Sequence, residues 1–420
     1  MTGRRPLNLR IRAGFPQGSP LVQDYLEGGE GSAPFYSGPF SELAPYRAKA
    51  DEVDERFGAG ERERASRLLT PSHERWRPRL QSWLEEGGYM VTTGQQPGLF
   101  GGPLYSLYKA LTAVNLARAL EEAVRKPVLP VFWVASEDHD WEEADHTHLL
   151  DMENQVRVFR LPEPGGQPHR PLHRIPLDPG TELTLRDFTE TLPETDFSDP
   201  YIKLLRDAFA PGSTLPSGFT STLKSLLAEL PLFFADAGDP ALKEASLPLL
   251  LQEMENARAH EEVLTHAAAR LQEAELGIQV PILEGGVNLF LEGPQGRDRI
   301  YRTESGFRLH RSGVELTGEE IRARAQRDPT LLSPNVLLRP VVESMLFPTL
   351  GYVAGPGEMA YFAQLEGYFG AFGITMPVIH PRFGALLLET KIEKVLEKFD
   401  LAAEALDRPY HELASEMARE

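Results

Sequence analysis

The chain has 420 residues, an apolar content of 41% and a formal net charge of −19, which together indicate a folded protein with a sizeable core. The acidic balance argues against non-specific binding to nucleic acid, and the absence of cysteine excludes disulfides, thiolate nucleophiles and cysteine-ligated zinc. With neither a signal peptide nor a run of about 18 apolar residues, the sequence predicts a cytoplasmic protein that does not bind a membrane.

Residues 1–150 are predicted to hold N-terminal helices and the first half of an α/β core. Helical patterns fill residues 46–88 and end at two glycines. The segment "YMVTTG", from Tyr89, predicts a short buried strand, and an amphipathic helical pattern follows from Leu104. The continuous apolar run at residues 128–135 is typical of a parallel strand covered on both faces. Strand, glycine-rich loop, helix and strand together make a βαβ unit.

The rest of the chain divides into three further predicted parts. Residues 151–230 are rich in proline and polar residues, so we expect a connecting module inserted between the two halves of one parallel sheet. Residues 231–385 are expected to form the second half of the core, with a strand within 232–240, a long helix after it and a β-rich insertion near 280–315. Residues 386–420 carry a charged amphipathic pattern that predicts a helical arm, the start of a coiled coil.

The glycine-rich loop between the first strand and its helix is the first candidate site. Five glycines fall between residues 88 and 102, and bare backbone at the start of a helix can present N–H groups to an anion. The same glycines could serve only a tight turn, and the pattern matches neither Walker A nor the dinucleotide fingerprint. The residues expected to hold a phosphate-bearing cofactor are Gly94, Gln95, Gln96, Gly98, Gly101, Gly102, Tyr105 and Lys109.

The acidic loop "SEDHDWEEADH" follows directly after the second strand. Ligands of open α/β sheets bind beyond the carboxyl ends of the strands, so this loop lies where chemistry is expected. A histidine between two aspartates suits general acid–base catalysis, and the same side chains could instead bind a divalent metal or form a solvated acidic loop. The candidate catalytic residues are Glu137, Asp138, His139 and Asp140, whereas His146 and His148 are more typical of a surface.

A third group of candidates lies in and around "SPNVLLRPVVESMLFPTLGYVAGPGEMAYF". A glycine–proline loop follows its apolar strand, and arginines among apolar neighbours need an anionic partner. That partner could be a ligand or an internal glutamate, Glu343 or Glu358. We expect Gly355, Gly357 and Glu358 to contact a cofactor, and Asn335, Arg339, Tyr361 and Arg382 to contact the substrate.

Three long blocks of the sequence together resemble a known family. They are "TTGQQPGLFGGPLYSLYKALTAVNLA", "VLPVFWVASEDHDWEEADH" and the segment from "SPNVLLRP" to "MPVIHPR". On these blocks the chain resembles the BshC family, the cysteine-adding enzymes of bacillithiol biosynthesis, over most of residues 1–410. The resemblance implies a Rossmann-like α/β core with connecting-peptide insertions like those of class I aminoacyl-tRNA synthetases, and a homodimer formed through the C-terminal coiled coil.

The resemblance also implies a reaction, the addition of L-cysteine to glucosaminyl-malate in the last step of bacillithiol synthesis. Because a carboxylate must be activated before it forms an amide, we expect ATP with Mg²⁺ as co-substrate and no tightly bound metal. The glycine loop and Lys109 would then hold phosphates, and His139 would assist the leaving phosphate or the attacking amine. Arg339 and Arg382 would receive the malate carboxylates.

Two other functions remain open on the sequence alone. A metal-dependent hydrolase of an amide or sugar derivative could use the residues from Glu137 to His148, and a non-catalytic adapter of the thiol pathway could use the helical arm. Family members continue beyond the point where this chain stops, so we expect an arm cut inside its first helix at Glu420, whether the chain is short by nature or truncated. The expected partners are small molecules, with no nucleic acid and no membrane, and a homodimer would depend on the arm.

Overall fold

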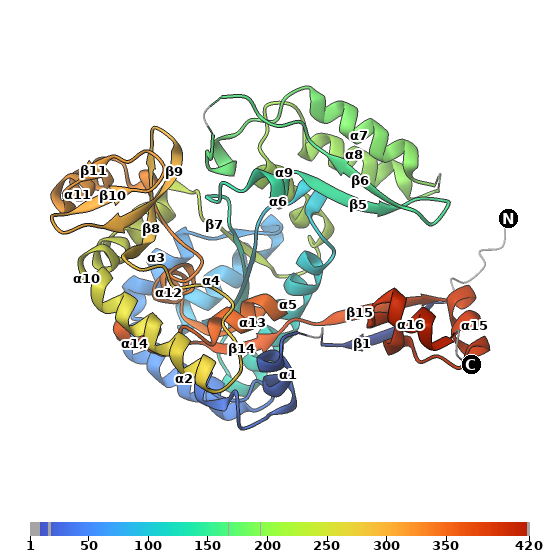
Figure 1. Ribbon diagram of the computed structural model, residues 1–420, viewed down its shortest axis with the longest axis horizontal. Helices are drawn as coiled ribbons and strands as arrows, with labels where there is room; N and C mark the ends of the chain where they lie inside the picture. The colour runs from blue at the N-terminus through green and yellow to red at the C-terminus, as the bar shows by residue number, and fades with distance from the viewer. Residues whose placement is uncertain (1–8, 16–17, 167, 194, 418–420) are drawn as a thin grey trace. The chain divides into compact units, whose positions relative to one another are not determined.

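The computed structural model describes residues 9–15, 18–166, 168–193 and 195–417 (Figure 1). The chain divides into two compact units, one formed by Gln17–Arg382 and the other by Met1–Pro16 together with Phe383–Glu420. Glu420, where the arm was expected to end, lies outside the described residues. The larger unit contains the sheet on which the candidate site is built.

A six-stranded sheet, counted over the described residues, forms the centre of the larger unit. Its strands in spatial order are β14 (Val378–Pro381), β13 (Thr349–Ala354), β3 (Tyr89–Gln95), β4 (Val128–Val134), β7 (Phe233–Asp236) and β2 (Thr70–Pro71). Neighbouring strands are parallel except at the edge, where β2 pairs antiparallel with β7. Because β4 precedes residues 151–230 and β7 follows them, the strands on both sides of that segment belong to one sheet, as expected from the sequence.

Helices cover both faces of this sheet, which explains why β3 and β4 are buried along almost their whole length. Phe132 faces one side and its neighbour Trp133 the other, as the alternation of a strand requires. The first face is covered by α2 (Leu43–Arg56), α5 (Tyr105–Val124) and α9 (Leu215–Leu226). The second is covered by α4 (Arg77–Glu86), α10 (Pro240–Glu273), α12 (Arg339–Leu346) and α13 (Pro356–Phe362).

The segment between β4 and β7 carries a hairpin and three longer helices. Its elements are α6 (Trp141–Ala144), β5 (His146–Leu150), β6 (Val156–Arg160), α7 (Gly180–Thr191), α8 (Ser198–Ala208) and the helix α9. Leu172, Phe209 and Leu215 belong to a small core of this segment, whereas Phe219 of α9 packs with the strands of the main sheet. The last helix of the insertion therefore fastens it to the core.

A second, antiparallel sheet follows the long helix α10. In spatial order its strands are β11 (Glu315–Leu316), β10 (Phe307–Leu309), β9 (Gly296–Arg302), β8 (Gly286–Gly293) and β12 (Leu332–Pro334). This sheet contains the β-rich insertion expected near residues 280–315. Sequence analysis missed β12, which has only three residues and pairs with the more distant β8.

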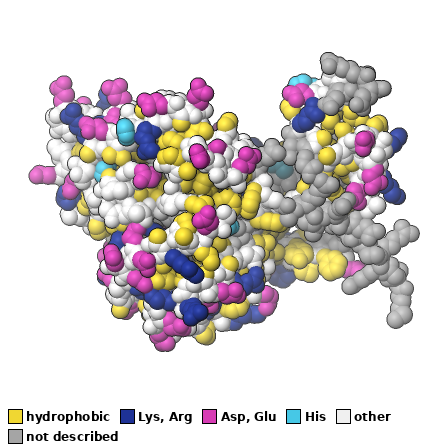
Figure 2. Space-filling view, turned by 90° about the horizontal axis from the view of Figure 1, so that it is seen from below, with side chains coloured by type: hydrophobic (Ala, Val, Ile, Leu, Met, Phe, Trp, Pro, Cys, Tyr) yellow, Lys and Arg dark blue, Asp and Glu magenta, His cyan; other side chains and the backbone are white. Residues whose placement is uncertain are grey.

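The remaining helices of the larger unit are short. They are α1 (Pro20–Glu27), α3 (Ala59–Arg67), α11 (Gly318–Arg327) and α14 (Glu366–Ala371). Across the described parts of the chain, no helix combines the length and apolar character needed to cross a bilayer. Acidic and basic side chains are interspersed on the face of the molecule shown in Figure 2.

The smaller unit pairs the two ends of the chain. β1 (Leu9–Gly14) runs antiparallel to β15 (Gly384–Glu389), and α15 (Thr390–Lys398) and α16 (Tyr410–Met417) follow. The prediction of a helix from residue 386 is therefore wrong at its start, and the helical part is interrupted between Lys398 and Tyr410. Short apolar runs fit a strand or a helix equally well, and here the deciding partner strand lies at the other end of the chain.

Candidate active site

A cavity of about 670 Å³ opens at the carboxyl ends of β3, β4 and β13, against β8 and β9. Ligand sites of open parallel sheets form at this edge because the loops that follow the strands gather there. Most candidate residues line this one cavity, namely Gly94, Gln95, Gln96, Tyr105, Lys109, Glu137, Asp138, His139, Asn335, Arg339, Gly355, Gly357, Glu358, Tyr361 and Arg382.

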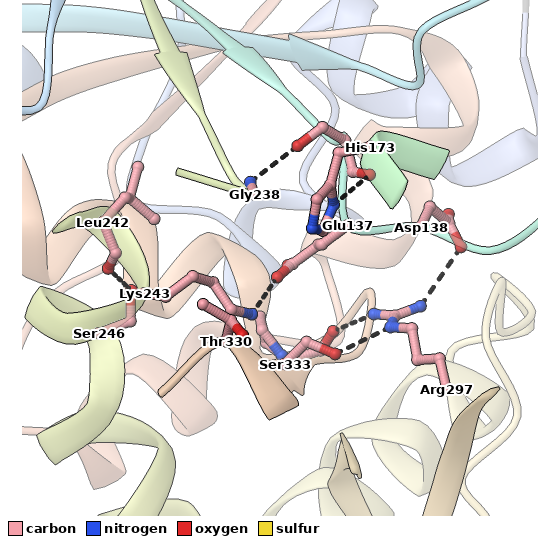
Figure 3. A network of polar contacts seen from close by, with 12 residues as sticks. Glu137, Asp138, His173, Gly238, Leu242, Lys243, Ser246, Arg297, Thr330 and Ser333 are labelled. Atoms are coloured by element: carbon pink, nitrogen blue, oxygen red, sulfur yellow. Dashed lines mark hydrogen bonds and ion pairs between the residues drawn. The ribbon is translucent and has the colours of Figure 1, made fainter. Parts of the chain in front are cut away.

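The acidic loop after β4 begins with a buried ion pair. A carboxylate oxygen of Glu137 lies 2.6 Å from Nζ of Lys243 on α10, and the two side chains are 9% and 3% exposed (Figure 3). Burial lowers the pKa of Lys243, and the charge of Glu137 opposes this shift. Glu137 therefore anchors the loop to α10, and its carboxylate is not free to act alone in the cavity.

Asp138 is held as a carboxylate by donors from three directions. It accepts hydrogen bonds from the backbone N–H of His139 (2.7 Å), from the amide of Gln96 and from Nη1 of Arg297 (3.3 Å; Figure 3). Burial alone would raise the pKa of Asp138, but the hydrogen bonds from His139 and the charge of Arg297 hold it well below its usual range.

His139 contacts a carboxylate and two guanidinium groups. Its Nδ1 lies 3.3 Å from Oδ1 of Asp138 and 3.2 Å from Arg297, and its Nε2 lies 3.2 Å from Nη2 of Arg311. A guanidinium can only donate, and a neutral imidazole carries one N–H. Nδ1 therefore meets both an acceptor, Asp138, and a donor, Arg297, whereas Nε2 meets only the donor Arg311. In the tautomer with its proton on Nδ1, the ring donates to Asp138 and Nε2 accepts from Arg311.

Asp140 has a structural position in the same loop. It is the N-cap of α6, and its side chain accepts a hydrogen bond from the backbone N–H of Glu143 (3.1 Å). Glu143 lines the cavity in its place. Burial raises the pKa of Glu143, with Gln96 opposing and the charges of Asp140 and Asp138 adding to the shift.

Lys109 is buried at the bottom of the cavity, where it joins the loops after β3 and β13. Its ammonium lies 2.5 Å from Glu358 and donates to the carbonyl of Gly94 (2.7 Å) and to Oε1 of Gln95 (3.0 Å). Burial lowers the pKa of Lys109, while Glu358 opposes the shift. The three donor positions of the ammonium are thus all used within the protein.

Arg339 makes the internal ion pair that the sequence left open as an alternative. Its guanidinium lies 2.8 Å from Glu343 and donates to the hydroxyls of Tyr361 (2.8 Å) and Tyr352 (3.2 Å). Burial raises the pKa of Glu343 to about 7, although Arg339 opposes the shift. Tyr352 in turn donates to Glu358 (2.7 Å), so this group is connected to Lys109.

Asn335 fixes the approach to α12. Its Oδ1 accepts hydrogen bonds from the backbone N–H groups of Leu337 and Leu338, both at 3.0 Å, and its amide donates to Asn288 (2.9 Å). Asn288 also donates to Glu253 of α10, which is fully buried. The cavity wall at Asn335 is therefore tied to the long helix by a buried polar network.

The remaining residues of the loop after β13 lie at the cavity surface. The backbone N–H of Gly355 donates to Glu358 (2.7 Å), which caps α13, and an added Cβ on Gly357 would meet no atom within 4 Å. The guanidinium of Arg382 lies over the ring of Tyr105, 5.3 Å from its centroid. These groups face the same space as the loop after β3.

Three glycines of the glycine-rich loop lie away from the cavity, contrary to expectation. Gly101 (φ 98°) and Gly102 (φ 74°) have backbone conformations that favour glycine, and added Cβ atoms would meet Thr222 and Phe219 of α9 at 3.1 and 3.2 Å. A Cβ on Gly98 would lie 2.8 Å from the backbone of Gly102. The bare backbone of this part of the loop thus permits close packing against α9.

Sequence analysis missed the arginines that the second sheet contributes. Arg297 and Arg299 of β9 line the cavity, and Arg311 reaches His139 from the turn after β10. Nε of Arg297 donates to Ser333 (2.8 Å; Figure 3). The guanidinium of Arg297 lies 4.1 Å from the ring centroid of Phe290. The signal was present as two arginines two positions apart in a strand, which therefore share one face.

Comparison with known proteins agrees with this architecture. The family model described as "Bacillithiol biosynthesis BshC, N-terminal Rossmann-like domain" matches residues 9–383. The chain belongs to the BshC family. The Rossmann-like α/β class expected from the sequence is thereby confirmed, while the coiled coil stays a prediction.

Individual BshC relatives match over most of this chain. A protein of Salinibacter ruber is 34% identical over 388 residues, which cover 91% of this chain and 70% of the relative. Proteins of Koribacter versatilis and Heliobacterium modesticaldum are each 36% identical, covering 80% and 76% of this chain and 62% and 58% of their own length. All three bear the name "Putative cysteine ligase BshC". The chain thus spans 58–70% of the length of these relatives.

Two carboxylates of the acidic loop form ion pairs with cations of the protein. Glu137 pairs with Lys243 and Asp138 with Arg297. In the part of the chain that the structure describes, no three His, Asp or Glu side chains are grouped as metal ligands. These two carboxylates are therefore paired with cations of the protein.

Proposed function

We propose that this chain is a ligase that joins the carboxyl group of L-cysteine to the amino group of glucosaminyl-malate, in the last step of bacillithiol biosynthesis. The names of the relatives support the reaction. The observation on the molecule that carries the proposal is the setting of His139, oriented by Asp138 inside a cavity at the carboxyl ends of the parallel strands. Such a histidine suits a step in which an amine must lose a proton.

The carboxylate of cysteine needs activation, because a carboxylate does not react with an amine at neutral pH. In this proposal ATP, entering with Mg²⁺, transfers either an adenylyl or a phosphoryl group to that carboxylate. The amine then attacks the activated carbonyl, the amide bond forms, and AMP or phosphate leaves. The first route releases AMP and pyrophosphate and the second releases ADP and phosphate, so the nucleotide product identifies the route.

The loops after β3 and β13 are the proposed nucleotide side of the cavity. Gly94, Gln95, Tyr105 and Gly357 line this side, and the guanidinium of Arg382 faces the same space. A phosphate role for Lys109 requires the ammonium to move away from Glu358 when nucleotide binds. Arg382, which lies over the ring of Tyr105 on this side of the cavity, is a second proposed phosphate contact.

In the tautomer whose proton lies on Nδ1, toward Asp138, His139 would act through the lone pair of Nε2. Arg311 donates to this nitrogen at 3.2 Å, and Arg311 is exposed. In the proposed step the substrate amine takes the place of Arg311, and Asp138 stabilises the imidazolium that forms.

The direct test is to incubate the chain with ATP, Mg²⁺, glucosaminyl-malate and isotopically labelled L-cysteine, and to follow the thiol product by mass. We expect product only with ATP present, and its loss in His139→Ala. His148→Ala, which changes an exposed histidine of β5, is the matched control and should keep wild-type turnover. Metal-dependent hydrolysis of glucosaminyl-malate, or binding without turnover, would contradict the proposal and favour a hydrolase or an adapter respectively.

A further inference from the structure

Arg297 and Arg339 line the cavity, and both are committed to partners within the protein. Arg297 donates to Ser333, to the carbonyl of Pro334 (2.7 Å) and to Asp138. Arg339 is neutralised by Glu343, as described above. The guanidinium groups of these two residues therefore hold the wall together.

Arg299 differs from both. It lies on the same face of β9 as Arg297, opposite Phe290 in the strand register, and its guanidinium is 5.2 Å from the centroid of that ring. Among the described residues, this guanidinium has no carboxylate within ion-pair distance and donates no hydrogen bond. It is half-buried and faces the cavity.

The surroundings of Arg299 are themselves positive. Burial lowers the pKa of Arg299, and the neighbouring charges of Arg297 and Arg311 lower it further, with only Tyr301 opposing. A half-buried cation beside two like charges is unfavourable without an anion, so uncompensated positive charge destabilises the empty site. A bound anion would compensate this charge.

We propose that Arg299 is the residue that recognises a carboxylate of the malyl group of the substrate. This inference rests on the proposed function. It assigns to Arg299 the binding of a malate carboxylate that the sequence had suggested for Arg339, whose guanidinium is already paired. The carboxylate of cysteine is a poorer fit, because a guanidinium bound to it would withdraw the electron density with which it must attack ATP. The malyl carboxylates pass through the reaction unchanged, so a permanent cation can bind one of them throughout.

Phe290 gives the site its geometry. The ring makes cation–π contacts with the guanidinium groups of both Arg297 and Arg299 in the lining of the cavity, and these contacts help to orient them. A planar guanidinium can bind a carboxylate through two parallel hydrogen bonds, whereas an ammonium cannot. Arg299→Lys should therefore recover only part of the recognition that Arg299→Gln removes.

The test compares three glycosides of glucosamine in the wild type and in Arg299→Gln. One carries malate, and the other two carry lactate or 3-hydroxypropionate, each lacking a different malate carboxylate. We expect Arg299→Gln to raise KM for glucosaminyl-malate about 10- to 100-fold, with kcat little changed. In the wild type, both monocarboxylate glycosides should have a higher KM than glucosaminyl-malate. In Arg299→Gln, the glycoside that lacks the carboxylate bound by Arg299 should have the same KM as glucosaminyl-malate, since that carboxylate no longer has a partner.

A control variant and a binding measurement separate this inference from the proposed function. Arg308→Gln removes an exposed arginine from β10 of the same sheet and should leave all three KM values unchanged. Calorimetric titration of glucosaminyl-malate without ATP should show weaker binding to Arg299→Gln, whether or not the chain ligates. Ligation by the wild type with equal discrimination in Arg299→Gln would overturn the role of Arg299 alone. If the wild type forms no product but binds glucosaminyl-malate more tightly than Arg299→Gln does, the proposed function is wrong and the anion site at Arg299 is supported.

Discussion

Two walls of the cavity treat buried charge in opposite ways. The paired wall consists of Lys109, Glu358, Arg339 and Glu343, in which each cation lies against a carboxylate at 2.5 or 2.8 Å. Tyrosine hydroxyls complete the hydrogen bonding between the two pairs. Within this wall each cation is already bound to a glutamate, so few of its donors are open to a ligand.

The cationic wall consists of Arg297, Arg299 and Arg311 from the second sheet, with His139 of the acidic loop in contact with two of them. Asp138 is the carboxylate that contacts it, and it is shared by His139 and Arg297. More positive groups than carboxylates therefore meet at this wall. The two walls thus show that, in an acidic protein, an anionic substrate can bind where cations lack carboxylate partners, whatever the total charge of the chain.

The largest effect that distinguishes the walls is expected from Lys109→Met. Removing the ammonium leaves Glu358 in a largely buried position with no cation, which costs about 3–5 kcal/mol of unfolding free energy. Urea unfolding measures this loss, and Lys109→Met/Glu358→Gln should recover part of it. Lys203→Met, which changes an exposed lysine, should shift the free energy by no more than about 0.5 kcal/mol. Equal effects of Lys109→Met and Lys203→Met would show that the paired wall is not structural.

The next largest effect concerns pH and Glu343 of the paired wall. Burial raises the pKa of Glu343 from its ordinary value of 4.5 to about 7. Between these pH values the folded state binds more protons than the unfolded state, so this residue makes the unfolding free energy fall as pH rises. The fall across the whole window is on the order of 3 kcal/mol. Unfolding curves at pH 5 and pH 7 should show it in the wild type relative to Glu343→Gln, and parallel pH profiles of the two proteins would contradict it.

On the cationic wall, His139→Ala should change activity far more than stability. The side chain lies at the cavity and adds little to the core, so the unfolding free energy should change by less than about 1 kcal/mol. Ligation should fall by about 100-fold if Nε2 accepts the proton of the amine. Turnover of the purified variant and its melting temperature test both parts, and near-normal turnover would remove His139 from the mechanism.

Long apolar runs made the main sheet predictable. β3, β4, β7 and β13 each follow from a short, largely apolar sequence that ends at a loop, and their order predicted that these loops would meet. By contrast, β15 could not be recognised, because its partner β1 lies at the other end of the chain. Local pattern specifies an element, whereas pairing decides between elements that fit the pattern equally well.

The site was predictable in position but not in the pairing of its charges. Sequence placed Lys109 in the helix after the glycine-rich loop and Glu358 in the glycine–proline loop of a distant segment, and only the folded chain shows that they form an ion pair. Likewise, nothing in the sequence near Arg299 indicates that the hairpin of β8 and β9 lies against the main sheet. The glycine-rich loop was the most conspicuous motif, yet Gly101 and Gly102 allow the loop to pack closely against α9 and do not line the cavity.

The smallest expected effect tests that use of glycine, by comparing Gly102→Ala with Gly357→Ala. Gly102 has φ 74° and ψ −171°, a region that is essentially restricted to glycine, and its Cβ would lie 3.2 Å from Phe219. Alanine there should cost about 1–3 kcal/mol of unfolding free energy. Gly357 lies inside α13 with open space at its Cβ, so alanine should be neutral or stabilising by up to about 1 kcal/mol. Since Gly357 lines the cavity and Gly102 does not, nucleotide affinity should respond in the reverse order, with Gly357→Ala the weaker binder. If Gly102→Ala is stable but binds nucleotide more weakly, Gly102 contributes to the ligand site, and the loop does not divide into a packing part and a binding part.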